Sequence, residues 1–190
     1  EMCIRDRPTV AAEKPLTITG ITVPAGGNVT ILYDAKTNGF APLNTESSIV
    51  NTATITGGGI AAPIEATETV NVATGLNLSI VKSVSPTEVS ENGQLTYTFL
   101  IENYGNVDAT AADAVTVTDI FNPILKSITV TYNGTAWPAG TNYTYDETTG
   151  TFTTLAGQIT VPKATFAQNA ETGEWSVTPG ISTLTVTGTV

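Results

Sequence analysis

The 190-residue chain contains no histidine, which removes the usual general base, the usual proton shuttle and the commonest metal ligand at once. Serine-triad, cysteine-protease and zinc chemistry are therefore not expected. Its one cysteine, Cys3, lies in Glu1–Arg7, a stretch whose composition differs from everything after it. This stretch resembles translated sequencing-adapter read-through, so we set residues 1–8 aside as a foreign or disordered start. The remainder has no cysteine, which excludes a disulfide within it.

Charged residues are also scarce, at 13% of the chain where about a quarter is typical. The formal net charge of -10 is spread thinly, which argues against nucleic acid and anionic membranes as partners. No apolar run approaches the ~18 residues of a membrane-spanning helix, so we expect no membrane insertion. No signal peptide is visible, but we interpret the chain as starting within a longer protein, so this absence does not indicate the cytoplasm.

The chain does contain many short stretches in which apolar and polar residues alternate with the two-residue period of a β-strand. We expect strands over 15–20, 29–35, 49–55, 65–72, 76–84, 95–103, 115–119, 128–132 and 183–188. Hairpin turns are expected at Asn133-Gly134, Thr149-Gly150 and Thr172-Gly173. No segment shows a convincing helical period, so the sequence predicts an all-β protein, an antiparallel sandwich.

A short internal repeat suggests how the chain is divided. Leu184-Thr185-Val186-Thr187-Gly188 matches Leu16-Thr17-Ile18-Thr19-Gly20, 168 residues earlier. We therefore expect residues 9–75 to be the C-terminal strands of one β-sandwich repeat and residues 76–190 the N-terminal strands of the next. Neither copy would then be complete. In the alternative, the two parts complement each other and close one sandwich, as in a circular permutant.

Three polar residues share a strand face with apolar neighbours: Lys82, Asp119 and Asn51. An unpaired charge in a core is costly, so Lys82 should reach the sheet edge, find a partner or lose its proton. A lysine, an acid and an asparagine are also the groups that a spontaneous isopeptide bond needs. Burial would favour a neutral amine as nucleophile and a neutral carboxylic acid that polarises the asparagine carbonyl as ammonia leaves. The simpler interpretation is a partly buried ion pair between Lys82 and Asp119.

Four motifs carry a family resemblance, namely Ile80-Val81-Lys82-Ser83-Val84, Gly93-Gln94-Leu95-Thr96-Tyr97-Thr98, Ile101-Glu102-Asn103-Tyr104-Gly105-Asn106 and Val115-Thr116-Val117-Thr118-Asp119. In this order they resemble the bacterial surface-repeat family called domain of unknown function eleven. They are also similar to the related isopeptide-forming pilin and collagen-adhesin A-type domains. The resemblance covers about 76–132, and Val50-Asn51-Thr52-Ala53-Thr54 resembles the closing strand of a preceding copy.

The resemblance implies immunoglobulin-like sandwich repeats in a long exported protein of the cell wall or surface. It also implies Lys82 as the nucleophile of an isopeptide bond, Asp119 as the catalytic acid and an asparagine equivalent to Asn51 as the acceptor. Because Asn51 belongs to the preceding copy in this pattern, the acceptor for Lys82 would lie about 168 residues beyond it, outside this chain.

Four aromatic residues suggest a different hypothesis, because Trp137, Tyr143, Tyr145 and Trp175 would stack on sugars if they were exposed and coplanar. The simpler interpretation is that they fill the core or cover its rim. The loop acids at 108, 113, 146 and 147 lack a regular calcium-ligand spacing, so we expect solvated loops and no metal. Nothing in the sequence indicates a cofactor.

We therefore expect a non-enzymatic structural repeat, a stalk or spacer of an extracellular adhesin or pilus-like protein at a bacterial cell surface or cell wall. Its expected partners are neighbouring repeats of the same chain, while other domains would bind host proteins, matrix proteins or glycans. The alternative is a carbohydrate-binding β-sandwich module of a secreted protein. A hydrolase ranks third, since no paired-carboxylate arrangement is evident.

Overall fold

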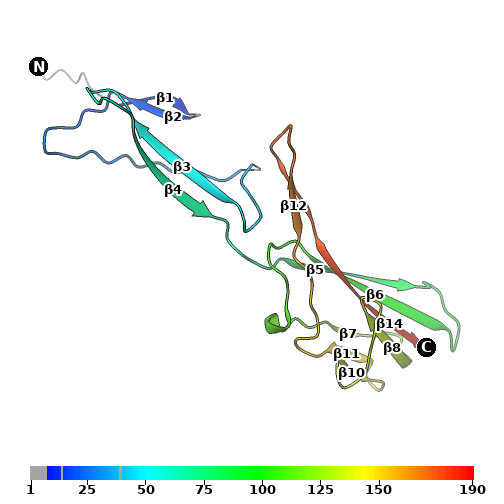
Figure 1. The fold of residues 1–190 in the computed structure, drawn as a ribbon. Helices are drawn as coiled ribbons and strands as arrows, with labels where there is room; N and C mark the ends of the chain where they lie inside the picture. The colour runs from blue at the N-terminus through cyan, green and yellow to red at the C-terminus, as the bar shows by residue number, and fades with distance from the viewer. Residues whose placement is uncertain (1–7, 14, 39) are drawn as a thin grey trace, which may run out of the picture. The chain divides into compact units, whose positions relative to one another are not determined.

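The computed structural model describes residues 8–13, 15–38 and 40–190. It divides into two compact units, with the boundary between Thr37 and Asn38. Nearly all of its regular structure is β-strand (Figure 1), which confirms the all-β prediction. In the described ranges the one helical element is a single 3-10 turn, η1 (Ala111–Asp113). No helix there is long and apolar enough to cross a membrane.

The first unit contains a short antiparallel hairpin of β1 (Thr9–Glu13) and β2 (Leu16–Thr19). The strand expected over 29–35 is not formed. Val29 and Ile31 alternate as a strand would require, but each keeps nearly half of its surface exposed. An alternating pattern produces a stable strand only where a neighbouring strand and a covered face exist, and that prediction was therefore wrong.

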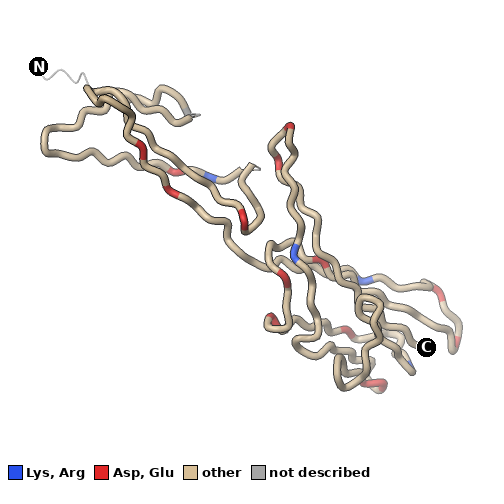
Figure 2. The backbone as a smooth tube through the Cα atoms, in the orientation of Figure 1, with Lys and Arg blue, Asp and Glu red and all other residues tan. Residues whose placement is uncertain are grey.

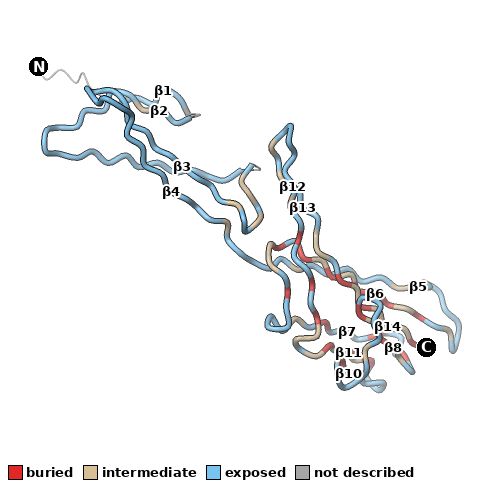
Figure 3. Tube along the Cα trace, in the orientation of Figure 1, coloured by how far each residue is buried: buried red, intermediate tan, exposed pale blue. Residues whose placement is uncertain are grey.

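The second unit begins with a two-stranded antiparallel hairpin of β3 (Ser48–Ile55) and β4 (Ile64–Asn71). Every residue of both strands is exposed, as the pale blue tube in Figure 3 shows. The two hydroxyls of Thr52 and Thr67 lie 3.1 Å apart across the hairpin. The hairpin contributes no buried residue, and the link from β4 to the next strand covers residues 72–77.

The largest sheet has the strand order β5-β6-β14-β8-β9, and all neighbours are antiparallel. Its strands are β5 (Leu78–Ser85), β6 (Gln94–Asn103), β8 (Lys126–Tyr132), β9 (Thr135–Trp137) and β14 (Gly180–Thr189). Strands β6 and β14 pair over ten residues, and β5 and β9 are the two edges. The β8–β9 turn is the expected Asn133-Gly134 pair, and φ angles of 48° and 78° place both residues in the left-handed region that this tight turn requires.

A three-stranded sheet of order β10-β11-β7 contributes the other side of the core. It contains β7 (Thr118–Ile120), β10 (Tyr143–Asp146) and β11 (Thr151–Thr154). A separate hairpin is formed by β12 (Thr165–Gln168) and β13 (Trp175–Thr178). The turns of the β10–β11 and β12–β13 hairpins contain the predicted Thr-Gly pairs.

Aromatic rings join the two sheets in the core. Every second residue of β6 from Leu95 to Asn103 is buried. The ring centroid of Phe121 lies 4.8 Å from that of Tyr97 on β6 and 5.9 Å from that of Phe152 on β11. The burial drawn in red in Figure 3 corresponds to buried residues between Leu95 and Val186. This arrangement is an antiparallel β-sandwich, as the alternation predicted.

Two rows of hydroxyl side chains cross the outer face of the large sheet. The strand registers align two rows across four strands, Ser83-Thr98-Thr185-Thr131 and Ser85-Thr96-Thr187-Thr129. The hydroxyls of Thr96 and Thr187 lie 2.9 Å apart. Figure 2 shows how few basic positions the backbone carries. Hydroxyls give this face water-binding groups without the repulsion that rows of like charge would create.

Candidate functional site

The lysine singled out in the sequence lies on the edge strand β5 and faces the inside of the sandwich. In the register of the sheet Lys82 is opposite Phe99 of β6. Leu78 and Val84, four and two positions away on the same strand face, pack against the core. The ammonium of Lys82 forms an ion pair with Asp119. The structure therefore brings together two of the three predicted site residues.

Asp119 reaches this pair from the opposite sheet. It lies on β7, where its register partner is the fully buried Phe152. One carboxylate oxygen, Oδ1, accepts a hydrogen bond of 3.0 Å from the N–H of Ile120. The other oxygen, Oδ2, is buried and contacts the Lys82 ammonium. The Asp119 side chain is 18% exposed and the Lys82 side chain 41%, so the pair lies at the mouth of the space between the sheets.

Three aromatic rings surround the lysine ammonium. The Nζ atom of Lys82 lies 4.7 Å from the ring centroid of Tyr97, 5.5 Å from that of Phe121 and 5.7 Å from that of Phe99. The negative faces of such rings attract a cation at these distances. The sequence pattern around Lys82 does not mark these rings as part of the site. A two-residue turn at Asn92-Gly93 would place Asn103 opposite Lys82, whereas the observed register differs by four residues and places Phe99 there.

The arrangement has a definite chemical capacity. Because the ammonium and the carboxylate are in contact, one proton transfer converts the ion pair into a neutral amine and a neutral carboxylic acid. A neutral amine is a nucleophile, and a neutral carboxylic acid can donate a hydrogen bond to an amide carbonyl. Attack on a primary amide would form the Nζ–C bond, break the C–N bond of the amide and release ammonia, with no oxidant or reductant required. The pair therefore has the groups for isopeptide formation except the acceptor.

Asn51, the predicted acceptor, lies on a different sheet. It is exposed on β3, where its register partner across the hairpin is Glu68 of β4. Neither β3 nor β4 belongs to the two sheets that hold Lys82 and Asp119.

Two asparagines organise the loop that follows β6. Asn103 is completely buried, accepts the N–H of Gly105 at 2.9 Å and donates to the carbonyl of Val107 at 2.8 Å. Asn106 accepts the N–H of Gly75 at 3.0 Å and donates to the carbonyl of Ala73 at 2.9 Å. From its place at the end of a strand, Asn103 is expected to bond loop backbone, as it does, whereas the bonds of Asn106 were not predicted. The two asparagines fasten the loop and the link from β4 to β5.

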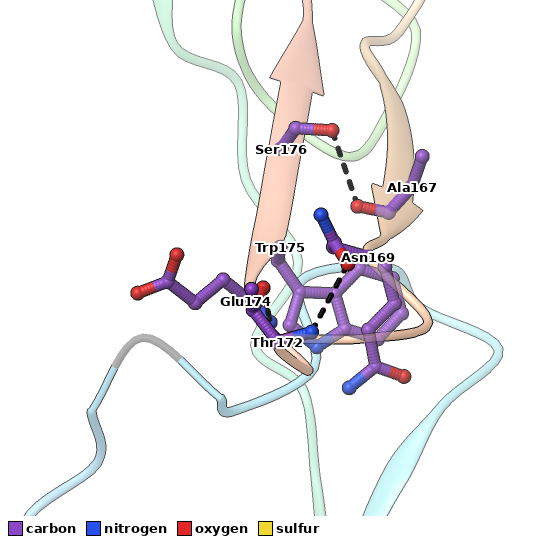
Figure 4. Close-up of a pocket in the computed structure, with 7 residues that line it drawn as sticks. Ala167, Asn169, Thr172, Glu174, Trp175 and Ser176 are labelled. Carbon is purple, nitrogen blue, oxygen red and sulfur yellow. Dashed lines mark hydrogen bonds between the residues drawn. The ribbon is translucent and has the colours of Figure 1, made fainter.

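The four aromatic residues of the sugar-binding hypothesis lie on three different sheets. Trp137 on β9 stacks on Tyr132 at 4.6 Å, and Tyr143 on β10 is buried. Tyr145, also on β10, donates its hydroxyl to the Leu125 carbonyl at 2.8 Å. Trp175 lies on β13, and Figure 4 shows its indole in a hollow at the turn of the β12–β13 hairpin. This arrangement offers no coplanar exposed platform.

The loop acids identified in the sequence accept hydrogen bonds from backbone N–H groups. Asp108 accepts the N–H of Lys163 at 2.7 Å, and Glu147 accepts that of Ser127 at 3.0 Å. The pKa of Asp113 is lowered by hydrogen bonds from the backbone N–H and the hydroxyl of Thr110. In the part of the chain that the structure describes, no three metal-ligating side chains are grouped.

The pKa of Asp146 is lowered mainly by the N–H of Thr148, with a further contribution from the hydroxyl of Thr149. These bonds close the turn between β10 and β11.

Comparisons of the chain with protein-family models, with curated proteins and with solved structures find no match. The class of protein is therefore defined by its own fold, an all-β sandwich with a lysine–aspartate pair between its sheets.

Proposed function

We propose that the chain is a non-enzymatic structural repeat that spaces or presents other domains and bears load along its strands. The motifs around Lys82 and Asp119 resemble those of bacterial surface repeats, which supports an extracellular location at a cell surface or cell wall. Neighbouring repeats of the same protein are its proposed partners. One geometric observation, the direction in which the chain enters and leaves the large sheet, carries the proposal.

In chain order, β5 is the first strand of the large sheet and β14 is the last. The two run parallel to each other on either side of β6. Leu78 at the start of β5 is opposite Asn103, which is opposite Gly180 at the start of β14. Thr189 at the end of β14 is opposite Gln94, at the other end of the sheet. The chain thus enters at one end and leaves at the other, roughly 30 Å away for a ten-residue strand.

This geometry favours resistance to tension. A force that separates the two ends slides β5 and β14 past β6, so it loads all rungs of the hydrogen-bond ladder together. A hairpin pulled open from one end breaks the same bonds one after another. The ten-residue pairing of β6 with β14 is therefore loaded in its stronger direction.

The Lys82–Asp119 pair supports the same proposal, because it ties the edge strand β5 to the opposite sheet. An isopeptide bond from Lys82 to an asparagine equivalent to Asn51 would make this tie covalent in a repeat that has no disulfide. The carbohydrate-binding alternative has less support, since Tyr143 is buried and Tyr145 and Trp137 are engaged with Leu125 and Tyr132.

The test is single-molecule force spectroscopy of the full chain with two pairs of attachment points. Cysteines at Thr74→Cys and Val190→Cys pull along the sheet, and cysteines at Glu91→Cys and Val190→Cys pull β6 from β14 at one end. The second geometry is a true peeling geometry because Asn92 and Gly93 hydrogen-bond to Val190 at 3.0 Å. Cys3→Ser in both proteins leaves only the engineered thiols for attachment.

We expect the first pair to need a clearly higher unfolding force than the second, with the same free energy of unfolding in urea for the two proteins. Equal forces in the two geometries would contradict a load-bearing role.

Sugar binding is tested by a separate measurement. Exposed aromatic platforms lose fluorescence or shift their emission when glycans bind. We expect no saturable change in tryptophan emission with cell-wall or host polysaccharides.

A further inference from the structure

The outer edge of β5 has a row of backbone groups that no other strand of the sheet pairs with. The N–H of Tyr104 donates to the carbonyl of Asn77 at 2.8 Å, in register with the β5–β6 ladder. In an antiparallel pair the hydrogen-bonded positions alternate. Odd-numbered residues of β5 therefore bond to β6, and the even-numbered residues direct their N–H and C=O groups to the free edge. These residues are Leu78, Ile80, Lys82 and Val84.

The same edge leaves apolar surface uncovered on the inner side of the sheet. Ile80 shares a face with Leu78 and Val84, which pack against the core, yet it is 51% exposed. The opposing sheet has three strands against five, and β7, its edge strand, is only three residues long. One more strand beside β5 would cover Ile80 and satisfy the free backbone groups.

An inward-pointing lysine on an edge strand normally prevents such pairing, because an incoming strand would bury its charge. Here Asp119 neutralises Lys82, and three aromatic rings already surround the ammonium. The protection that the lysine would give is therefore largely cancelled. An uncharged strand could dock beside β5 without burying an unpaired charge.

The chain itself contains a strand with the matching properties. Strand β3 has eight residues, as β5 does, and carries no charged side chain. Apolar residues on both of its faces are exposed, among them Ile49 at 37%, Val50 at 59% and Ile55 at 61%. A two-stranded hairpin exposed on both faces is only marginally stable by itself. Docking would cover one of these faces.

We propose that the free edge of β5 is a docking site for strand β3 of a second copy of this chain. Ile49, Asn51 and Ala53 of the incoming strand continue the inner face formed by Ile80 and Lys82. The chain's own hairpin is not the occupant, because its link to β5 is bound to Asn106 through Ala73 and Gly75.

Because the donor strand and the acceptor edge differ, the contact is heterologous and each copy can both give and receive a strand. Copies would therefore join in rows whose length rises with concentration. This inference depends on neither the load-bearing function nor an isopeptide bond, since strand pairing is non-covalent and reversible.

The experiment measures the molar mass of the full chain by light scattering across a range of concentrations. We expect species larger than a dimer, and in urea a return to the mass of one chain. Ile80→Lys should reduce the mass to that of one chain at every concentration, because an ammonium without a carboxylate partner would then face the incoming strand. Ile181→Lys is the matched control: Ile181 is 50% exposed but lies on the central strand β14, so association should persist.

A donor-side pair of variants tests the identity of the incoming strand. Ile49→Glu places a charge on the proposed inner face and should abolish association, whereas Val50→Glu on the opposite face should reduce it less. The Ile80→Lys variant keeps an intact β3, and the Ile49→Glu variant keeps an intact β5 edge. Mixing the two variants should therefore restore a complex of one copy of each. Circular dichroism checks that all variants are folded.

A full chain that stays monomeric at all concentrations would overturn the proposal. So would association that survives both Ile80→Lys and Ile49→Glu, or a mixture of these variants that forms no complex although each is folded.

Discussion

Replacing Asn103 by alanine tests whether one buried side chain holds the loop between β6 and β7. The side chain is completely buried and makes two short hydrogen bonds to loop backbone, to Gly105 and to Val107. It also accepts a longer bond of 3.4 Å from the N–H of Asn77. Alanine removes these bonds and leaves the N–H of Gly105 and the carbonyl of Val107 without this partner.

The magnitude follows from the two short bonds. A typical hydrogen bond contributes about 1 kcal/mol net, and a buried group left without a partner costs about 1–3 kcal/mol. We therefore expect Asn103→Ala to lower the free energy of unfolding by about 3 kcal/mol. Since small domains are stable by roughly 5–15 kcal/mol, the variant should still fold.

The assay is urea unfolding followed by far-ultraviolet circular dichroism and tryptophan emission. Asn142→Ala is the control, because the Asn142 amide donates one part-buried bond of 2.7 Å to Gln158, so its loss should cost about 1 kcal/mol. A loss at Asn103→Ala no larger than that of the control would refute the reasoning. Asn103→Asp adds a check of sign: its carboxylate would face the Val107 carbonyl, so its stability should improve as acid protonates it.

Three further predictions follow from contacts described above. A double-mutant cycle with Lys82→Met and Asp119→Asn should show a coupling free energy of about 1 kcal/mol in urea unfolding, because the ion pair is partly exposed. Additive effects of the two single substitutions would show that the ion pair contributes nothing to stability. Gly105→Ala should lower the unfolding free energy by about 1–3 kcal/mol, since a Cβ there would lie 2.7 Å from the Asn77 nitrogen and also meet the Gly75 carbonyl oxygen; an unchanged urea midpoint would contradict this close approach. Because the pKa values of Asp113 and Asp146 are lowered, the two carboxylates stabilise the fold above pH 3.8, their ordinary pKa, and this contribution is lost as the pH falls towards their folded pKa values. The double variant Asp113→Asn with Asp146→Asn should therefore lose stability less steeply in acid. An unaltered acid limb of the stability–pH curve would contradict this role of the two carboxylates.

The sequence predicted those parts of the fold that depend on local chemistry. Alternation located β6, and the Asn133-Gly134 pair located a turn whose two positive φ angles these residues tolerate. The contact between Lys82 and Asp119 was also predicted, because a charge in phase with apolar neighbours needs a partner. Asn103 was expected to bond loop backbone at a strand end, and it does so.

Features that depend on pairing between distant segments could not be predicted in the same way. Alternation shows which residues share a face but does not identify the neighbouring strand, so nothing in 183–188 indicated that β14 lies between β6 and β8. For the same reason residues 29–35 have a strand pattern but form no strand. The aromatic rings around Lys82 become visible only once β5, β6 and the Phe121 loop are assembled.

The scarcity of basic side chains beside the hydroxyl rows of the large sheet has a consequence for proteolysis. Residues 76–190 contain only three basic side chains, Lys82, Lys126 and Lys163. A protease that cuts after lysine or arginine therefore finds three sites in 115 residues. Lys82 and Lys126 lie in strands of the large sheet, and the backbone N–H of Lys163 is bound to Asp108. A surface wetted by hydroxyls is thus also one that trypsin-like enzymes have few places to digest.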